Sequence, residues 1–325
     1  MLKSRYLNYL NLNSMISPRV SIILLVKNEM KNLPRLIATL SGQKFRSGFE
    51  VIAVDSGSND GSVEFLELQE KIQKKFKVRF FRIKPREFGH GKTRNLATEK
   101  AKGKIFVFLT ADALPLKNDW LEKLTRPLES NFAAAFSRLI PYSQGTIFDE
   151  YFDSVIYPNK DRVISNENNR ELFLADYMYY SNVSGAIKKE VFIKIPFDRD
   201  KIMSEDQWWG KKAIEAGYKI KYVCKSVVMH SHTYAFGKFF DRQFTSGYSL
   251  IGIRRFLILR LIIIGIPYLF GEGYYILSKG KVFSFLYMFF YEGFRFFSFV
   301  VGILGDKIPI RLRNKLFYYL PLKKT

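Results

Sequence analysis

The chain has 325 residues, 47% of them hydrophobic, so it can bury a full core and is not an intrinsically disordered protein. Its single cysteine, Cys224, excludes a disulfide framework, and no apolar leader precedes the first strand, so we expect a reducing, cytoplasmic location. The formal net charge of +22 calls for an anionic partner, either nucleic acid or an acidic membrane surface.

Apolar runs alternate with segments of helical periodicity after a polar, aperiodic stretch, residues 1–17, which we expect to be a flexible lead-in. The expected strands are 20–26, 51–54, 78–83, 104–115 and, later, 221–232; the expected helices lie within 27–43, 62–76 and 93–102. Strands that alternate with helices in this way predict an α/β fold with a mainly parallel, Rossmann-like sheet flanked by helices.

Polar residues follow the carboxyl ends of these strands, where sheets of this class bind ligands. They are Asn28 and Glu29 after the first strand, Asp55 after the second, FGHGKTRN (88–95) after the third and Asp112 after the fourth. No GxGxxG and no GxxxxGK[ST] is present, which argues against a dinucleotide fingerprint and against a P-loop. Acids that face a basic loop are typical of a metal-bridged diphosphate site.

Several motifs in this region resemble those of family-two glycosyltransferases of the GT-A fold. The strings VSIILLVKNE, VDSGSNDGS, GKTRN, LTADALP and SEDQWW occur in the family's order, within roughly residues 18–235. The segments HGKTRNLA, SNVSGAIKKEVF and VVMHSHTY are most similar to bacterial rhamnosyltransferase-type members that build surface polysaccharides. The resemblance implies inverting, metal-dependent transfer of a hexose-type sugar, with rhamnose as the candidate, from a nucleoside-diphosphate donor to a glycan.

The resemblance also assigns nucleotide-binding residues. It places Asn28 and Glu29 beside the base or ribose, Asp55 on the base, and Arg94 beside the diphosphate, with Lys92 or His90 as a helper. Asp112, which matches an acid of the metal motif, also faces the donor. Without the resemblance, Arg94 is an ordinary solvated cation at a helix start.

The expected metal site departs from the family pattern. Asp112 matches the second acid of the Asp-X-Asp motif, but Thr110 stands where the first acid is usual. One carboxylate is a small ligand set for Mg²⁺ or Mn²⁺, and the resemblance offers His230 or His232 to complete it. Residues two apart on a strand face opposite sides, so we expect only one of these histidines to serve. The alternative is that either histidine only caps the strand end by hydrogen bonding.

The segment SED, directly before a helix, supplies the expected general base. The resemblance assigns removal of the acceptor proton to Asp206, while Glu205 orients backbone or substrate. Adjacent carboxylates at a helix start point in different directions, so they can have different partners. The alternative is a pair of acids that a helix N-terminus favours electrostatically.

The acceptor site is expected near two further features. Either Trp208 or Trp209 can stack on an acceptor sugar, in which case the other belongs to the core. Ser184 and Gly185 match a stretch that borders the donor sugar and acceptor in the family, although Gly185 could instead only ease strand packing.

Residues 236–325 are expected to form a basic, amphipathic and apolar helical region that associates with a membrane. The last 75 residues hold twelve Lys or Arg and three acids, threaded through aromatic and aliphatic runs. Such a tail argues against a nucleic-acid partner. It predicts a peripheral or monotopic position on the cytoplasmic side of an anionic membrane. A lipid-linked glycan acceptor would lie at the same surface. A buried helical subdomain is the alternative.

A second function stays open at this point. A non-catalytic member of the fold would bind a nucleotide sugar or a glycan without transfer, and the missing first metal acid favours that hypothesis. The intact Glu205 and Asp206 pair argues against it.

Overall fold

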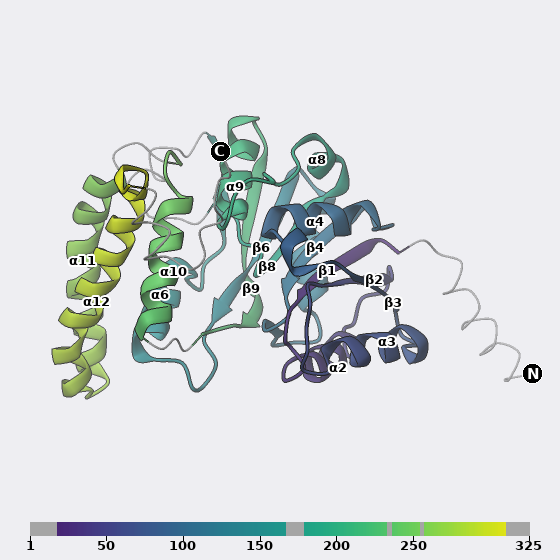
Figure 1. The fold of residues 1–325 in the computed structure, drawn as a ribbon, viewed down its shortest axis with the longest axis horizontal. Coiled ribbons are helices and arrows are strands. Elements are labelled where there is room, and N and C mark those ends of the chain that lie inside the picture. Colours follow the sequence, from purple (N-terminus) through teal and green to yellow (C-terminus); the bar gives the residue numbers. More distant parts are fainter. Residues whose placement is uncertain (1–17, 167–178, 233–235, 254–256, 310–325) are drawn as a thin grey trace, which may run out of the picture.

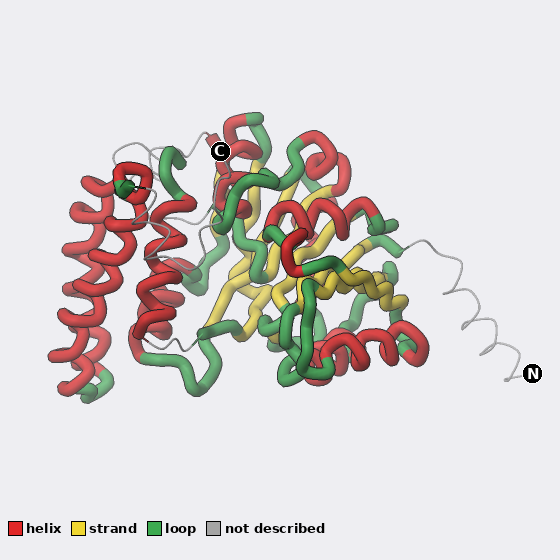
Figure 2. The backbone as a smooth tube through the Cα atoms, in the orientation of Figure 1, coloured by secondary structure: helices red, strands yellow, loops and turns green. Residues whose placement is uncertain are grey.

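The computed structural model describes residues 18–166, 179–232, 236–253 and 257–309, which form one sheet flanked by helices and a helical layer at one end (Figures 1 and 2). The strands are β1 (Val20–Val26), β2 (Phe49–Asp55), β3 (Lys77–Arg82), β4 (Ile105–Thr110), β5 (Leu114–Pro115), β6 (Phe132–Ile140), β7 (Arg162–Ile164), β8 (Ser184–Lys188) and β9 (Lys219–Met229). The helices are α2 (Leu33–Ser41), α3 (Ser62–Ile72), α4 (His90–Glu99), α5 (Trp120–Thr125), α6 (Ile147–Ile156), α8 (Lys189–Lys194), α9 (Glu205–Glu215), α10 (Phe236–Ser249), α11 (Leu257–Ser278) and α12 (Val282–Ile303).

The sheet is mainly parallel, as the alternation of elements predicted. Its order is β3-β2-β1-β4-β8-β6-β9-β5, with β7 paired to β9. β1 pairs in parallel with β2 and β4, whereas β8 runs antiparallel to β4 and β6. The aliphatic run of β1 is buried almost throughout because helices cover both faces: α2 and α3 lie below the strands in Figure 1, and α4 lies above them.

Helix α4 begins at His90, three residues before the expected start, so much of the basic segment is helical and not a loop. Asn95 ties this helix to the chain before α9, because its amide donates to the carbonyl of Phe197 at 2.9 Å and its oxygen accepts from the Phe197 N–H at 3.1 Å. A Cβ at Gly91 would lie 2.3 Å from the carbonyl oxygen of Asp198, so only glycine permits this approach. The packing of α4 therefore fixes where Arg94 points.

At one end, α11 and α12 form an outer helical layer, with α6 and α10 between this pair and the sheet (Figure 1). Helices α10 and α12 touch at Gly247 and Gly302, where an added Cβ would lie 2.2 Å from a backbone oxygen of the other helix. By length and apolar composition alone, Leu261–Ser278 and Val282–Ile303 could each cross a membrane. The boundary between a domain at 18–235 and a region at 236–325 stays a prediction, and residues 1–17 lie outside the described residues.

Candidate active site

A carboxylate and two imidazoles meet just past the ends of β4 and β9. Nε2 of His232 lies 3.3 Å and Nε2 of His230 lies 3.7 Å from Oδ2 of Asp112, and one ligand atom from each of the three falls within 4.8 Å of the others. Burial lowers the pKa of His230 to about 4 and also lowers that of His232, so both rings are neutral near neutral pH. Neutral imidazoles and a carboxylate are suitable ligands for a divalent metal.

The strand geometry behind the expectation that only one of these histidines can serve is wrong, because both rings lie near Asp112. β9 ends at Met229, so His230 and His232 follow the strand and are not bound to its two-residue alternation. The N–H of His230 donates to the carbonyl of Ile140 at 2.9 Å, and the two rings meet edge to face with centroids 4.6 Å apart. The hydroxyl of Thr110 is enclosed and has no hydrogen-bond partner among the described residues. Both imidazoles therefore lie beside the Asp112 carboxylate, and metal binding by either of them stays a prediction.

Asp206 is partly buried at the start of α9 and carries an unusual pKa. Its Oδ2 accepts from the backbone N–H of Asn182 at 3.0 Å, and its Oδ1 accepts from the N–H of Gln207 at 2.8 Å. Burial raises the pKa of Asp206 to about 6, and the neighbouring charge of Glu205 acts in the same direction. A carboxylate with a pKa near 6 is well suited to act as a general base near neutral pH.

Glu205 points away from Asp206 and is paired with Arg94. Its Oε1 lies 2.5 Å from Nη1 of Arg94 and accepts from the side-chain amide of Asn182 at 2.9 Å; both charged side chains are buried. Burial alone would raise the pKa of Glu205, but the charges of Arg94 and His90 outweigh it, so the pKa lies below its ordinary value. The two acids share Asn182, whose backbone N–H donates to Asp206 and whose side-chain amide donates to Glu205, but only Glu205 is paired with Arg94.

The residue before this acid pair has a strained backbone. Ser204, the N-cap of α9, has φ +59°, in the left-handed region that side chains other than glycine rarely adopt. Such strain is often found at functional sites, where surrounding contacts enforce it. Here the enforcing contacts are the bonds of Glu205 to Arg94 and of Asp206 to Asn182.

The turns after β1 and β2 are joined to each other near the cluster of Asp112, His230 and His232. The N–H of Asn28 donates to the Ser58 hydroxyl at 2.8 Å, and the carboxylate of Asp55 is fully buried and accepts from the N–H of Gly57 at 2.8 Å. Burial raises the pKa of Glu29, and the charge of Asp112 adds to it, so Glu29 lies within electrostatic range of the cluster. The base-reading and ribose-binding roles of these residues stay predictions.

Three residues expected at the acceptor are instead structural. Trp209 is 1% exposed in the main core, and its indole N–H donates to the carbonyl of Ile195. Ser184 is fully buried and bonds the hydroxyl of Ser137 at 2.8 Å, while a Cβ at Gly185 would collide with Tyr180. This burial agrees with the alternatives of a core role for one tryptophan and a packing role for Gly185, and the acceptor role of the three positions stays a prediction.

Trp208 is partly exposed and remains a candidate for the acceptor site. Its indole N–H donates to the carbonyl of Ser249 at 2.7 Å, and the ammonium of Lys201 lies 4.0 Å from its ring centre.

Lys92, expected near the diphosphate, is exposed on the first turn of α4. Its role stays a prediction.

Arg242 on α10 is a site residue that the sequence did not single out. It is exposed and makes no hydrogen bond or ion pair with another described residue. After burial, which has the largest effect, the charge of Arg242 helps to lower the pKa of His90, His230 and His232, so Arg242 is near all three. In the sequence, Arg242 is one arginine in the aromatic stretch FGKFFDRQF. This stretch has the same basic and apolar composition as the region that follows it, so nothing in it marks Arg242 as a site residue.

Comparisons with known proteins fit this geometry. The sequence profile described as Glycosyl transferase family 2 matches residues 21–195. The O-antigen chain rhamnosyltransferase RfbN of Salmonella typhimurium is 30% identical over 201 residues, 61% of this chain and 62% of that protein. WbaN of Salmonella anatum, also an O-antigen chain rhamnosyltransferase, is 29% identical over 61% of each chain. The chain thus spans about three fifths of the length of the curated relatives it matches.

Solved structures share the fold. The mannosyltransferase PcManGT from Pyrobaculum calidifontis, in complex with GDP-Man and Mn²⁺, has a TM-score of 0.60 at 15% identity and covers 93% of this chain and 95% of its own. Residues 1–349 of TarS from S. aureus, in complex with UDP-GlcNAc, have a TM-score of 0.53 at 15% identity. The match covers 89% of this chain and 91% of that one. These likenesses confirm the expected GT-A architecture.

Proposed function

Because the chain belongs to glycosyl transferase family 2, we propose that it moves a sugar with inversion from a nucleoside-diphosphate donor to a glycan hydroxyl. The observation that carries this proposal is a chain of contacts between Asp206 and the cluster of Asp112, His230 and His232. Asp206 accepts from the N–H of Asn182, and the carbonyl of the next residue, Val183, accepts from the N–H of Thr110, two residues before Asp112. Burial raises the pKa of Asp206 to about 6. The likeness to two O-antigen chain rhamnosyltransferases supports rhamnose as the transferred sugar.

Proton removal is the task that we assign to Asp206. Inversion requires the acceptor hydroxyl to attack the anomeric carbon opposite the leaving diphosphate, and Asp206 takes the proton of that hydroxyl as the new bond forms. Glu205 remains ionised and paired with Arg94, so it fixes the helix start and does not compete for the proton. The N–H groups of Asn182 and Gln207 orient the Asp206 carboxylate.

Asp112, His230 and His232 are the residues that we propose to hold a divalent metal. The donor set of one oxygen and two nitrogens fits Mn²⁺ better than Mg²⁺, which strongly prefers oxygen ligands. When bound, such an ion neutralises charge on the leaving diphosphate.

The dependence of the rate on pH is a direct expectation of this assignment. Only ionised Asp206 can accept a proton, and because its raised pKa is about 6, kcat/KM should fall about tenfold per pH unit below that value and be level above it. Initial rates of nucleoside diphosphate release across pH, with thermal unfolding to confirm the native fold, check this. A rate that is constant from about pH 5 to pH 7 contradicts it.

Arg242 is the cation that we propose to contact the donor diphosphate, in place of the buried Arg94. The Arg242→Ala variant should raise the donor KM by about 10- to 100-fold, since hydrogen bonds to charged groups contribute roughly 1.5–3 kcal/mol. Lys238→Ala, on the same helix and also exposed, is the matched control and should leave KM unchanged. Equal effects of the two substitutions would reduce the role of Arg242 to general surface charge.

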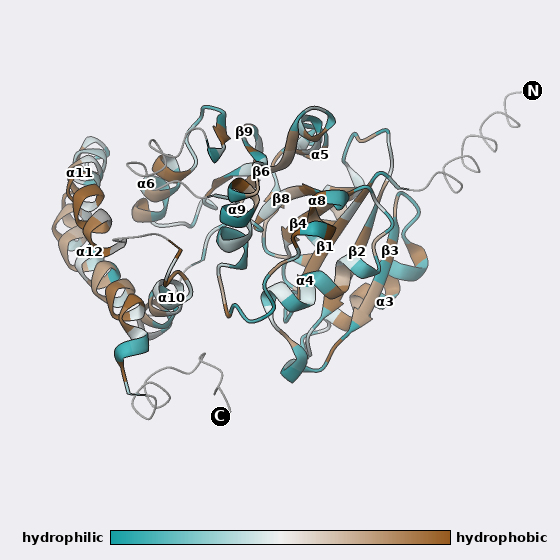
Figure 3. Ribbon diagram, turned by 90° about the horizontal axis from the view of Figure 1, so that it is seen from above, coloured by the Kyte–Doolittle hydropathy of each residue, from teal (hydrophilic) through white to brown (hydrophobic). Residues whose placement is uncertain are grey.

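The helices α11 and α12 are proposed to lie along an anionic membrane on the cytoplasmic side. Their outer faces expose large apolar side chains, with Phe270 77% and Phe283 88% exposed, as the brown colouring at the edge of Figure 3 illustrates. Their inner faces bury Glu272 and the ion pair of Glu292 with Arg295 against the rest of the protein. A helix pair held by α6 and α10 along one side offers only its other side to lipid, which supports a monotopic position.

Vesicle binding tests this membrane position. The double variant Phe270→Glu/Phe283→Glu should bind vesicles of phosphatidylglycerol and phosphatidylcholine at least about tenfold more weakly than the unaltered chain, since each buried Phe contributes roughly 1.5–3 kcal/mol. Ile193→Glu, an exposed apolar position on α8, is the control and should bind normally. Flotation in a density gradient measures binding, and unchanged flotation of the double variant contradicts the proposal.

Transfer itself is tested by nucleoside diphosphate release from a panel of sugar nucleotides with Mn²⁺, Mg²⁺ or a chelator. We expect turnover of one donor, with a nucleoside-diphosphate rhamnose the first choice, and loss of turnover with the chelator. Donor binding without turnover, in the presence of lipid-linked acceptor extracts, would favour the alternative of a non-catalytic nucleotide-sugar or glycan-binding protein.

A further inference from the structure

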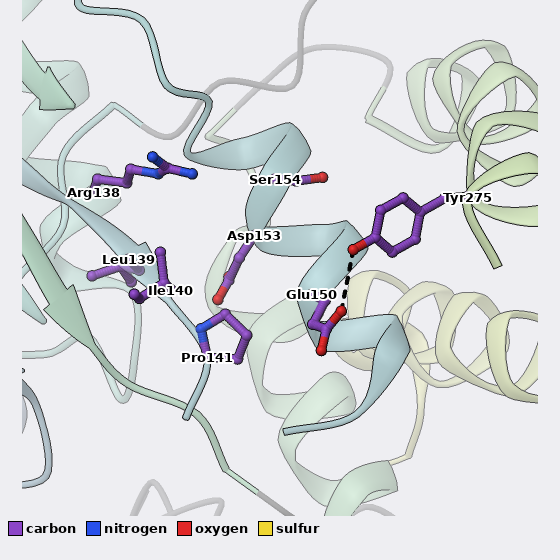
Figure 4. A pocket seen from close by; sticks show the side chains of 8 residues that line it. All are labelled: Arg138, Leu139, Ile140, Pro141, Glu150, Asp153, Ser154 and Tyr275. Atoms are coloured by element: carbon purple, nitrogen blue, oxygen red, sulfur yellow. Dashed lines mark hydrogen bonds between the residues drawn. The ribbon is translucent and has the colours of Figure 1, made fainter. Parts of the chain in front are cut away.

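A polar cavity of about 220 Å³ lies between the end of β6, helix α6 and helix α11 (Figure 4). Leu139 and Ile140 of β6 and the following Pro141 form its apolar wall, and Arg138 stands beside them. Helix α6 contributes Glu150, Asp153 and Ser154, and α11 contributes Tyr275. At roughly 30 Å³ per water molecule, the space holds about seven waters, and it is below the roughly 300–1,000 Å³ of sites that enclose drug-sized ligands. The volume therefore suits one small polar ring.

Two charged side chains of the cavity lack partners within the protein. The guanidinium of Arg138 and the carboxyl of Asp153 make no side-chain hydrogen bond or ion pair with any described residue, and Figure 4 shows both beside the space between β6 and α6. By contrast, Glu150 accepts from the hydroxyl of Tyr275 at 3.1 Å. Both side chains are half-buried and reachable by a ligand, and an unpaired donor and an unpaired acceptor in one cavity suit a ligand that supplies both.

The charges of the cavity select a neutral ligand. One guanidinium faces the carboxyl groups of Glu150 and Asp153, so no excess of positive charge is available for a phosphate or a carboxylate. Burial raises the pKa of Asp153 to about 7, and the charge of Asp149 adds to it, so this carboxyl can both donate and accept near neutral pH. A compound rich in hydroxyl groups satisfies donors and acceptors alike, and the apolar wall suits the C–H face of a sugar.

The cavity adjoins the proposed base through α6. Tyr157, which follows α6 directly, bonds Ser181 and lies within electrostatic range of both Asp153 and Asp206. At the other end of the cavity, Pro141 precedes Tyr142, whose hydroxyl donates to the carbonyl of Asp112 at 2.9 Å. The cavity thus lies beside the reaction site, on the side that faces the helices α11 and α12.

From this placement we infer that the cavity binds a single neutral sugar residue of the acceptor, held between the unpaired Arg138 and Asp153. The inference rests on the proposed glycosyl transfer. The sugar would be one already present in the growing glycan. Because Tyr275 belongs to α11, a chain that leaves the membrane beside this helix reaches the cavity before it reaches Asp206.

Ligand-observed saturation-transfer NMR tests the inference with methyl glycosides of rhamnose, mannose, galactose, glucose and N-acetylglucosamine as probes. At least one should bind the full chain, and Asp153→Asn, which keeps the shape of the side chain, should weaken it about tenfold. Ser154→Phe, which places a ring at the rim, should weaken it by at least as much. Val155→Phe, at the next position of α6 but outside the cavity, is the matched control and should bind as the unaltered chain does.

Two outcomes would overturn the inference: no glycoside binds the unaltered chain, or Val155→Phe weakens binding as much as Ser154→Phe. Release of nucleoside diphosphate is measured on the same samples. Glycoside binding without donor turnover contradicts the proposed transfer and leaves the cavity as a sugar site. Donor turnover without glycoside binding contradicts the cavity alone.

Discussion

The Asp206→Asn variant is expected to transfer sugar about 10²- to 10⁴-fold more slowly than the unaltered chain, the range typical of a lost general base. The amide is nearly the same size and keeps an oxygen to accept from the N–H of Asn182, so the fold should persist. It cannot take a proton from the acceptor hydroxyl, so the chemical step loses its base. Nucleoside diphosphate release at saturating donor and acceptor measures the change.

A matched control separates this effect from a general effect on α9. Glu215→Gln neutralises an acid at the other end of the same helix, where the side chain is 61% exposed, and should transfer at the normal rate. Donor affinity, measured by calorimetry, should be the same in Asp206→Asn and the unaltered chain. A residual rate above about a tenth of normal would assign the proton to another group.

Removal of Arg94 should destabilise the protein by about 3–5 kcal/mol, as expected when one partner of a buried ion pair is lost. The Arg94→Met variant keeps most of the apolar volume but leaves the carboxylate of Glu205 buried without its cation. The free energy of unfolding from urea titration is the measurement. Arg79→Met, which removes a partner of Glu50 from a less buried pair, should cost less and serves as the comparison.

A double variant shows whether the unpaired charge of Glu205 causes the loss of stability in Arg94→Met. Arg94→Met combined with Glu205→Met removes both charges and should recover much of the lost stability, because no unpaired charge remains. The pKa of Glu205 is depressed in the folded state, so its stabilising effect is present above the unfolded pKa and is lost as pH falls through the lower, folded value. If Arg94→Met instead weakened donor binding with no loss of stability, the original diphosphate role of Arg94 would stand.

The parallel sheet could be predicted because its signals are local. The apolar run at 20–26 matches β1 residue for residue, and the Leu and Ile spacing after it matches the buried face of α2. The strand-end acids were found for the same reason, since a change from apolar to polar marks where a buried strand ends. The order of β8, β6 and β9 was not accessible, because it depends on pairing between distant segments.

The parts of the site that sequence reasoning missed depend on tertiary packing. Trp208 and Trp209 are adjacent on one helix, and only the packing of α9 against the sheet decides that Trp209 enters the core. His230 and His232 converge because β9 stops one residue before them, a boundary that strand periodicity does not resolve. Arg242 comes from a helix whose basic, aromatic composition indicated a membrane, and its electrostatic effect on His90, His230 and His232 follows only from the packing of that helix.

The contact between Arg94 and Glu205 joins residues 111 positions apart in the chain. During synthesis, a ribosome that has completed α4 must add more than a hundred further residues before Arg94 can meet its carboxylate. Until then neither Glu205 nor Asp206 has been made, so a nascent chain that already contains β1 to β4 carries the cation of the pair without its carboxylate. The buried ion pair that holds the start of α9 therefore forms late in synthesis.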